Sequence, residues 1–432
     1  MASPDIPPEQ RALFEYGGLV SFNFLAIDDA GQETHILRQT DLAGFLRVNL
    51  DGAHEFFLRA HTSYLDFNEG DAFRSSGDDL VEPTLDRAHY RFNLQRSMAA
   101  YEGRQIPFNV IVQGGRQLVH WANGLTLSEQ IDGAVVRVSH NQMTLDMLAG
   151  VTRDTTTDFD SSRPNFTNDT QRNFYGAMLA VQALPRHRPY VYGIVQRDNN
   201  PSEVATVGGV AHEFEYDSHY IGFGSTGSFR DNLVYGLEMV YEGGRGLSAS
   251  TGPVSSQTEE PISAMAMDLR IDHLLNDPNR SRIGGEVLLA TGDKDRRTTS
   301  NTVGGNRSGT DDHAFNGFGL INTGLAFSPD VSNLLMFRAG ASTFPLRGRG
   351  IFDRMQVGVN LLIFNKLNRT GPIAEATDDN RYLGWESDLF VNWQLRSDLS
   401  VTLRYGVFFP GDAIQTDHDE RHFFFSGITL AF

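Results

Sequence analysis

The sequence predicts an all-β protein, a single transmembrane antiparallel β-barrel of about eighteen strands within a range of about sixteen to twenty. Three observations predict this fold. The chain contains no run of about 18 apolar residues, which excludes membrane-spanning helices. Segments of alternating residues recur along the chain and average about eleven or twelve residues, the length of a tilted transmembrane strand. The chain also ends in such a segment, and its last residue is Phe432.

The final segment, from Arg421 to Phe432, has no charged face. Alternate residues from His422 to Phe432 form one mostly apolar face, because side chains of a strand point to opposite sides in turn. The intervening residues, from Phe423 to Ala431, are also uncharged. The last core strand of a soluble β-sandwich would be the alternative interpretation. The remaining segments have to decide between the two.

Nineteen segments of the chain read as strands, and all of them alternate with a period of two. They are expected near residues 18–28, 40–51, 56–64, 86–95, 106–118, 129–140, 142–152, 172–183, 189–198, 213–225, 229–241, 262–273, 281–291, 316–327, 331–342, 353–365, 384–396, 398–409 and 421–432. A barrel with both ends in the periplasm needs an even number. We therefore expect 353–365 to be a β segment inside a long external loop, which leaves eighteen wall strands, although its residues alternate as well as those of a genuine wall strand.

The connections between these segments differ in length. Short ones fall around Asn141, Pro185 to Arg188, Pro329-Asp330 and Arg396 to Asp398, whereas 67–82, 153–171, 199–212, 242–261, 292–315 and 410–420 are long and polar. Outer-membrane barrels have short periplasmic turns and long extracellular loops. Much of the acidic excess falls in the long connections, as in the run from Thr416 to Glu420.

Charge and composition exclude several functional classes. The formal net charge of −18 argues against a nucleic-acid partner, which would require basic surfaces. The chain has no cysteine, which excludes disulfides and thiol nucleophiles. Residues 1–17 are polar and proline-rich and read as a flexible lead-in to a barrel over 18–432. They lack the pattern of a signal peptide, so we expect that an exported form has already lost it.

Five short motifs occur at or near strand ends: Gly114 to Val119, Asp132 to Val135, Ala290 to Asp295, Tyr382 to Asp388 and Arg404 to Gly411. In order and placement they resemble motifs of the alginate export family of bacterial outer-membrane proteins, and the resemblance covers roughly Asp86 to Phe432. It implies an eighteen-stranded barrel that passes an anionic exopolysaccharide through an arginine-lined pore. The terminal strand resembles the closing strand of outer-membrane barrels, in which the C-terminal Phe is read by the barrel-assembly machinery.

If the apolar alternates face lipid, the wall directs a set of charged residues into the lumen. The acidic ones are Glu238, Asp268, Asp272, Glu286, Glu386 and Asp388, and Arg282 is among the basic ones. Each arginine either pairs with a carboxylate of a neighbouring strand or binds substrate carboxylates in series. The substrate-binding candidates are Arg47, Arg59, Arg91, Arg116, Arg137, Arg270, Arg338 and Arg404, with Arg59, Arg91 and Arg116 ranked first because His61 and His89 also point inward in that third of the wall.

The sequence therefore predicts a passive channel in the outer membrane that exports an alginate-like anionic polysaccharide. A general or small-solute porin and a structural or adhesive barrel with a plugged lumen remain the alternatives. Expected partners are outer-membrane lipid and lipopolysaccharide, the barrel-assembly machinery through Phe432, and a periplasmic export partner. We expect no catalytic residues, no cofactor and no metal; Asp293, Asp295, Asp311 and Asp312 could hold Ca²⁺, but a solvated acidic loop is the simpler interpretation.

Overall fold

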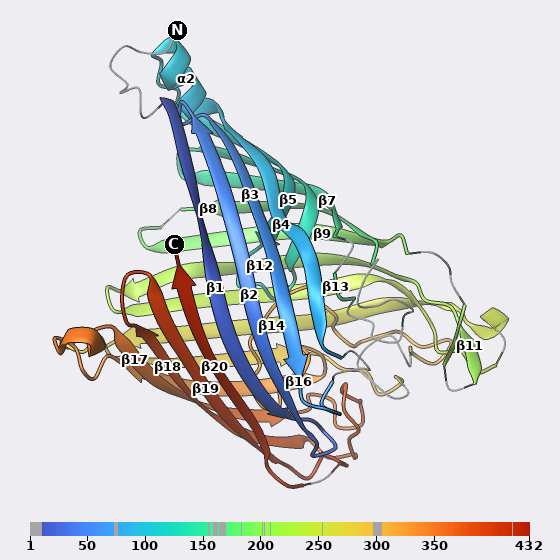
Figure 1. The fold of residues 1–432 in the computed structure, drawn as a ribbon. Helices are drawn as coiled ribbons and strands as arrows, with labels where there is room; N and C mark the ends of the chain where they lie inside the picture. Colours follow the sequence, from blue (N-terminus) through green and yellow to red (C-terminus); the bar gives the residue numbers. More distant parts are fainter. Residues whose placement is uncertain are drawn as a thin grey trace.

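In a computed structural model, the chain forms one closed antiparallel barrel (Figure 1). The structure describes all residues except 1–10, 73–76, 154–155, 159–162, 164–169, 183, 201, 203, 208, 253, 297–304 and 417. The wall is an 18-stranded sheet in which neighbours in sequence are neighbours in space, and β1 closes the ring by pairing with both β2 and β20. The predicted fold class is thereby confirmed.

Most wall strands are longer than those of soluble sheets, because each must cross the bilayer at a tilt. Their bounds are β1 Ala12–Asp28, β2 Thr34–Leu50, β3 His54–Phe67, β4 Asp79–Asn93, β5 Phe108–His120, β6 Ser128–His140, β7 Met143–Thr152, β8 Arg172–Val181, β9 His187–Asp198, β12 Tyr216–Arg230, β13 Leu233–Leu247, β14 Glu259–Leu274, β15 Arg282–Ala290, β16 Leu334–Thr343, β17 Met355–Asn365, β18 Tyr382–Gln394, β19 Leu399–Pro410 and β20 Arg421–Ala431. β1 thus begins earlier than the expected boundary at Gly18.

The remaining elements lie in the connections. They are helix α2 Leu94–Glu102, the 3-10 turns Val254–Ser256 and Gly350–Phe352, and a hairpin of β10 Ala205–Val207 with β11 Val210–His212. Helix α2 and the N-terminal end of β1 lie together at one end of the barrel, and the β10–β11 hairpin projects from the other (Figure 1). No helix in the described ranges is long and apolar enough to cross a membrane.

The expected count of eighteen wall strands is confirmed, but the prediction of which segment lies outside the wall is wrong. β17 is a wall strand that pairs with β16 and β18, so 353–365 does not belong to an external loop. The surplus segment is 316–327, which forms no ladder and lies inside the connection 291–333 between β15 and β16. Pro329-Asp330 belongs to the same connection and is therefore not a short turn.

The hydrophobic core of the described chain lies inside the barrel. Phe174 of β8 meets Phe318 edge to face at 5.0 Å, and Tyr220 of β12 meets Phe315 at 6.3 Å between ring centroids. Leu125 and Leu127, from the connection between β5 and β6, are buried in the same cluster. Residues 316–327 look strand-like in sequence because they alternate apolar residues, yet Phe318, Ile321 and Phe327 pack against the interior core instead of facing lipid.

Candidate functional site: the lumen

Most predicted substrate-binding arginines face the lumen and are paired with carboxylates of neighbouring strands. The pairs join Arg47 to Glu15 and Glu55, Arg59 to Asp86, Arg137 to Asp146, Arg270 to Asp268 and Glu286, and Arg338 to Glu286. Such pairing satisfies ions that would be costly to leave alone in a partly desolvated wall. An arginine carries five N–H donors, so a paired side chain at a lumen surface can still offer donors to a passing solute.

Two of the predicted substrate-binding arginines that face the lumen differ from the others. Among the residues that the structure describes, neither Arg91 nor Arg404 has a carboxylate within ion-pair distance. Arg404 donates to the side-chain oxygen of Asn392 at 2.7 Å, and its guanidinium stacks 5.4 Å from the ring centre of Phe390. Arg404 is therefore a positive charge that the wall does not neutralise.

Arg116 lies on the outer face of the barrel, unlike the other ranked candidates. It follows the lumen-facing position of Gly115 and precedes the buried Gln117, so alternation places it with Leu118, which is exposed to the outside. It is held by Asp132, with Nη2 2.7 Å from Oδ2. From this position Arg116 has no route to a solute in the lumen.

Two inward-folded connections occupy the lumen, and buried wall glutamates hold them. The backbone N–H groups of Asn123 and Leu125 donate to Glu238 at 2.8 and 3.4 Å. Glu242 accepts from the backbone N–H of Asn316 at 2.8 Å. Glu238 and Glu242 thus accept hydrogen bonds from loop backbones, which satisfies two buried carboxylates that face the lumen.

Glu386 of β18 makes the densest of these attachments. Its carboxylate accepts from the backbone N–H groups of Leu325 at 2.5 Å, Ala326 at 3.0 Å and Phe327 at 2.8 Å. The ring of Phe327 then stacks on that of Phe408 at 4.2 Å. One carboxylate and one aromatic stack therefore hold this part of the connection 291–333 against the wall.

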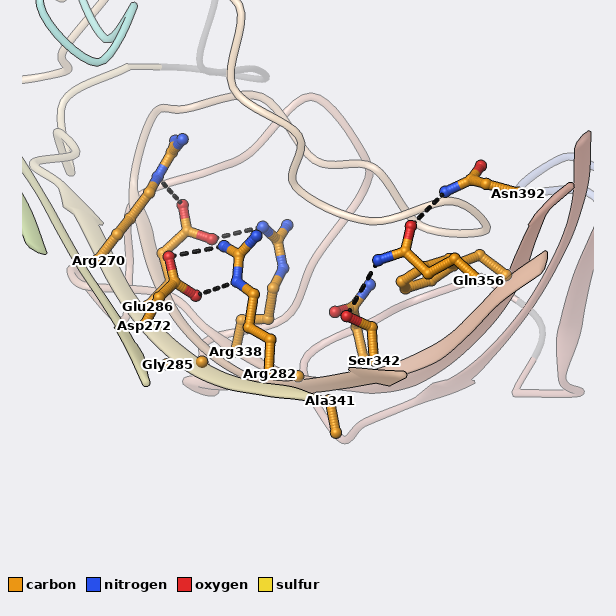
Figure 2. A pocket seen from close by; sticks show the side chains of 14 residues that line it. Arg270, Asp272, Arg282, Gly285, Glu286, Arg338, Ala341, Ser342, Gln356 and Asn392 are labelled. Carbon is orange, nitrogen blue, oxygen red and sulfur yellow. Dashed lines mark hydrogen bonds and ion pairs between the residues drawn. The ribbon is translucent and has the colours of Figure 1, made fainter. Parts of the chain in front are cut away.

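A polar cavity of about 390 Å³ opens beside these loops, towards the short-turn end of β14 to β18 (Figure 2). Arg282 lines it and binds Asp272 through two N–H groups at 2.7 and 2.6 Å, while the side chain remains 54% exposed. Gln356 accepts from Asn392 at 3.2 Å and donates to Ser342 at 3.2 Å. Figure 2 shows this amide chain facing the arginine cluster of Arg270, Arg282 and Arg338 across the cavity.

The cavity connects to a basic mouth at the same end of the barrel. Gln356 and Asn392 also line a neighbouring hollow, which shares Arg354 with a third cavity of about 510 Å³. Arg280 and Arg347 line that third cavity, and both belong to short connections between wall strands. Arginines therefore follow one side of the barrel from its short-turn mouth into the lumen. Sequence alternation could find Arg282, but not the arginines of the turns.

The acidic segment considered for Ca²⁺ is committed to other contacts. The guanidinium of Arg296 binds Asp312 with Nη2 at 2.5 Å from Oδ2. Burial alone would lower the pKa of Arg296, but the attraction of the Asp312 carboxylate outweighs burial and raises that pKa. Asp293 accepts from the backbone N–H of His313 at 2.7 Å. Within the described residues, no group of three or more potential ligands could hold a metal ion.

Comparison with solved structures agrees with this architecture. The barrel resembles Pseudomonas aeruginosa OccK11 (OpdR), with a TM-score of 0.56, 12% identity and coverage of 97% of this chain and 96% of that one. It also resembles OccK5 (OpdH) from the same organism, with a TM-score of 0.57, 12% identity and coverage of 97% of both chains. OpdK of that organism, solved with vanillate, has a TM-score of 0.55 at 10% identity and covers 97% of this chain and 98% of that one. No curated protein matches the sequence.

These features define an outer-membrane β-barrel channel. The family model described as alginate export matches residues 23–425, nearly the whole chain. The chain belongs to the alginate export family, as the motifs in the sequence indicate. The family and the fold are those of outer-membrane channels and porins.

Proposed function

We propose that the protein is a passive channel for a carboxylate-bearing saccharide, and specifically an alginate-like polymer that enters from the short-turn end. The observation that carries this proposal is the row of arginines that runs from Arg347 and Arg354 at the mouth to Arg282 and Arg404 beside the cavity. In outer-membrane barrels the short-turn end faces the periplasm. Entry from that end therefore corresponds to export.

The chemistry of the cavity suits a chain of acidic sugars. A guanidinium binds a carboxylate through two parallel N–H bonds, and side-chain amides such as Gln356 and Asn392 can donate to and accept from hydroxyl groups. Because Arg282 already has a carboxylate partner in Asp272, a substrate carboxylate would exchange with an internal one rather than bind irreversibly. Weak sites in series allow a solute to enter and also to leave.

Conductance measurements with size-matched blockers test the proposal. The purified protein is inserted into planar bilayers, and a six-sugar uronate oligomer or a neutral six-sugar glucan is added to either side. We expect the uronate to block the current at lower concentration, and more readily from the short-turn side. Arg282→Gln should weaken this block, whereas Arg186→Gln, on an exposed turn paired with Asp231, should not. Equal block by the neutral glucan would contradict the proposal, and the absence of any conductance would favour a structural barrel.

A small-solute porin is the second candidate, and the inward-folded connections favour it. The connection 291–333 and the one that contains Leu125 occupy part of the lumen, which restricts the size of a solute. OpdK, which shares the fold, was solved with the small molecule vanillate. Liposome swelling with graded uronate oligomers separates the two candidates. Entry of monomers with exclusion of the hexamer would support the porin.

A further inference from the structure

A charged hollow interrupts the outer face of the barrel at the long-loop end of β9, β12, β13 and β14. Its volume is about 310 Å³. The charged and titratable residues that line it are Arg197, Glu215, Asp217, His219, Arg245 and Glu259. The channel function uses none of them, because the hollow lies outside the lumen.

Alternation along the strands fixes which way these side chains point. Gln196, Ser218 and Glu242 are all buried on the inner side of the wall. Arg197 and Asp217 are their immediate neighbours in sequence and therefore face outward. Asp217 is directly opposite Arg245 in the ladder between β12 and β13, so Arg245 faces outward too.

The hollow lies where the lipid-facing surface changes from apolar to charged. One or two outward positions nearer the barrel centre, the same four strands carry exposed apolar or aromatic residues. These are Val195 of β9, Ile221 of β12, Tyr241 of β13 and, further from Glu259, Met265 of β14. Aromatic residues mark the interfaces of such barrels, and the polar headgroups begin there. The hollow is thus at headgroup height on the side of the long, extracellular loops.

Two glycines, Gly244 and Gly246, line this hollow. A Cβ on Gly244, whose φ is +148°, would lie 2.1 Å from the carbonyl oxygen of Asp217, so the backbones of β12 and β13 approach closely here. On the outward side of β13, a Cβ on Gly243 would lie 2.5 Å from Nε2 of His219, which lines the hollow, so the imidazole occupies the space that a side chain at this position would need.

Carboxylates hold the two arginines from one side only. Arg197 lies 2.7 Å from Asp217, and Arg245 lies 3.3 Å from Glu259, measured from Nη1 to the nearest carboxylate oxygen. The arginine side chains nevertheless remain 55% and 74% exposed. Each printed bond uses one nitrogen of a guanidinium that carries five N–H donors, so most of the donors are free for a ligand. Burial, followed by the nearby Asp217 and Glu259 carboxylates, raises the pKa of Glu215, which weakens its repulsion of an anion.

We propose that this hollow binds a phosphate-bearing headgroup of the outer-leaflet glycolipid, lipopolysaccharide, through Arg197 and Arg245. Phosphate oxygens accept the paired N–H groups of arginine bidentately, and the acyl chains of the same lipid would lie along Val195, Ile221 and Met265. A soluble phosphate could use the same donors but would gain nothing from that apolar surface. The site would fix the barrel in the leaflet without any part in conduction.

Lipid binding to the detergent-purified barrel tests the proposal. Native mass spectrometry is used to measure retention of bisphosphorylated lipid A, its dephosphorylated form, and inorganic phosphate as a competitor. We expect the double variant Arg197→Gln/Arg245→Gln to bind bisphosphorylated lipid A at least tenfold more weakly. The affinity of Arg245→Lys for bisphosphorylated lipid A should lie between those of the wild type and the double variant, because lysine keeps the charge but cannot bind phosphate bidentately. Arg186→Gln, which removes an equally exposed and paired arginine at the opposite rim, should leave binding unchanged.

Three results would overturn the proposal. They are equal loss of binding in Arg186→Gln, equal retention of dephosphorylated lipid A, and full displacement by millimolar inorganic phosphate. Heat-modifiable electrophoretic mobility confirms that each variant is folded. If the double variant is not folded, Arg245→Lys alone decides the outcome. Conductance should be unaffected in all of these variants, so the result is independent of the proposed transport.

Discussion

Replacement of Glu386 should release the part of the connection 291–333 around Leu325 to Phe327 from the barrel wall. In Glu386→Ala, the backbone N–H groups of Leu325, Ala326 and Phe327 would lose their acceptor. An unsatisfied buried donor costs about 1–3 kcal/mol, so the three together would cost about 3–9 kcal/mol if the segment stayed in place. Burial of the Phe327 ring against Phe408 opposes its release by about 1.5–3 kcal/mol. Over most of these ranges the penalty exceeds the packing, and the segment should leave the wall.

Single-channel recording measures this release. We expect Glu386→Ala to show higher conductance and greater current noise than the wild type, because the lumen gains both space and a mobile segment. Glu386→Gln should show a smaller effect, since its carbonyl oxygen can still accept from one or two of the N–H groups. Glu15→Ala is the matched control, because it removes a lumen-facing carboxylate whose partner is Arg47 rather than a loop backbone. A folded Glu386→Ala barrel with wild-type conductance and noise would refute the reasoning.

Three further outcomes follow from single positions. Arg404→Gln removes a charge that interacts by about 0.6 kcal/mol with an ion about 7 Å away in water. The anion-to-cation permeability ratio, measured from reversal potentials, should therefore fall about three- to sevenfold. An unchanged ratio would contradict the conclusion that no carboxylate neutralises Arg404. Gly115→Ala places a Cβ 2.3 Å from a backbone oxygen at a φ of +123° and should cost about 1–3 kcal/mol in urea unfolding, whereas Gly114→Ala, with open space around it, should cost far less. Tyr101 donates to Asp51 at 2.7 Å, which raises the pKa of Tyr101 to about 12. The phenol absorbance lost in Tyr101→Phe should therefore titrate near pH 12, and a midpoint near 10 would exclude the bond.

The Tyr101 result also has a defined consequence for helix α2. A folded pKa above the ordinary value means that the contribution of the neutral phenol to stability is complete below about pH 10. That contribution is then lost as the pH rises through about 12. Attachment of α2 to the turn that contains Asp51 should therefore be insensitive to pH in the neutral range, as hydrogen exchange of the helix can show.

The wall of this barrel could be predicted from sequence because lipid and water impose opposite demands on alternate residues. The period of two places Arg47, Arg137 and Arg270 in the lumen without any structural information. The same rule fails for 316–327, where apolar residues alternate for another reason. There, Phe318 and Phe327 pack against aromatic residues of the inner wall. A lumen lined in part by apolar side chains is a second apolar environment. Sequence alone does not distinguish a segment that packs against it from a strand that faces lipid.

The candidate site was predictable in its residue types but not in its partners. Aromatic residues near strand ends are typical of a membrane-interface girdle, yet Trp121 and Phe408 are both buried in the interior. Arg116 is expected in the lumen but lies on the outer face. The sequence motif around Gly115 gives no indication of which side of the wall each of its residues faces. The acceptors for loop N–H groups, such as Glu386, join residues about sixty positions apart, and no local pattern records such contacts.

The closing seam of the wall, between β1 and β20, has a consequence for assembly of the barrel. Gly18 and Phe432 exchange two backbone hydrogen bonds, 2.9 and 3.0 Å long, between opposite ends of the polypeptide. Without β20, β1 has no partner on one side and presents a row of unpaired N–H and C=O groups to any other strand. Because this seam joins segments that are about four hundred residues apart in sequence, both edges stay open until the whole wall has assembled, and an open edge can pair with a strand of another molecule.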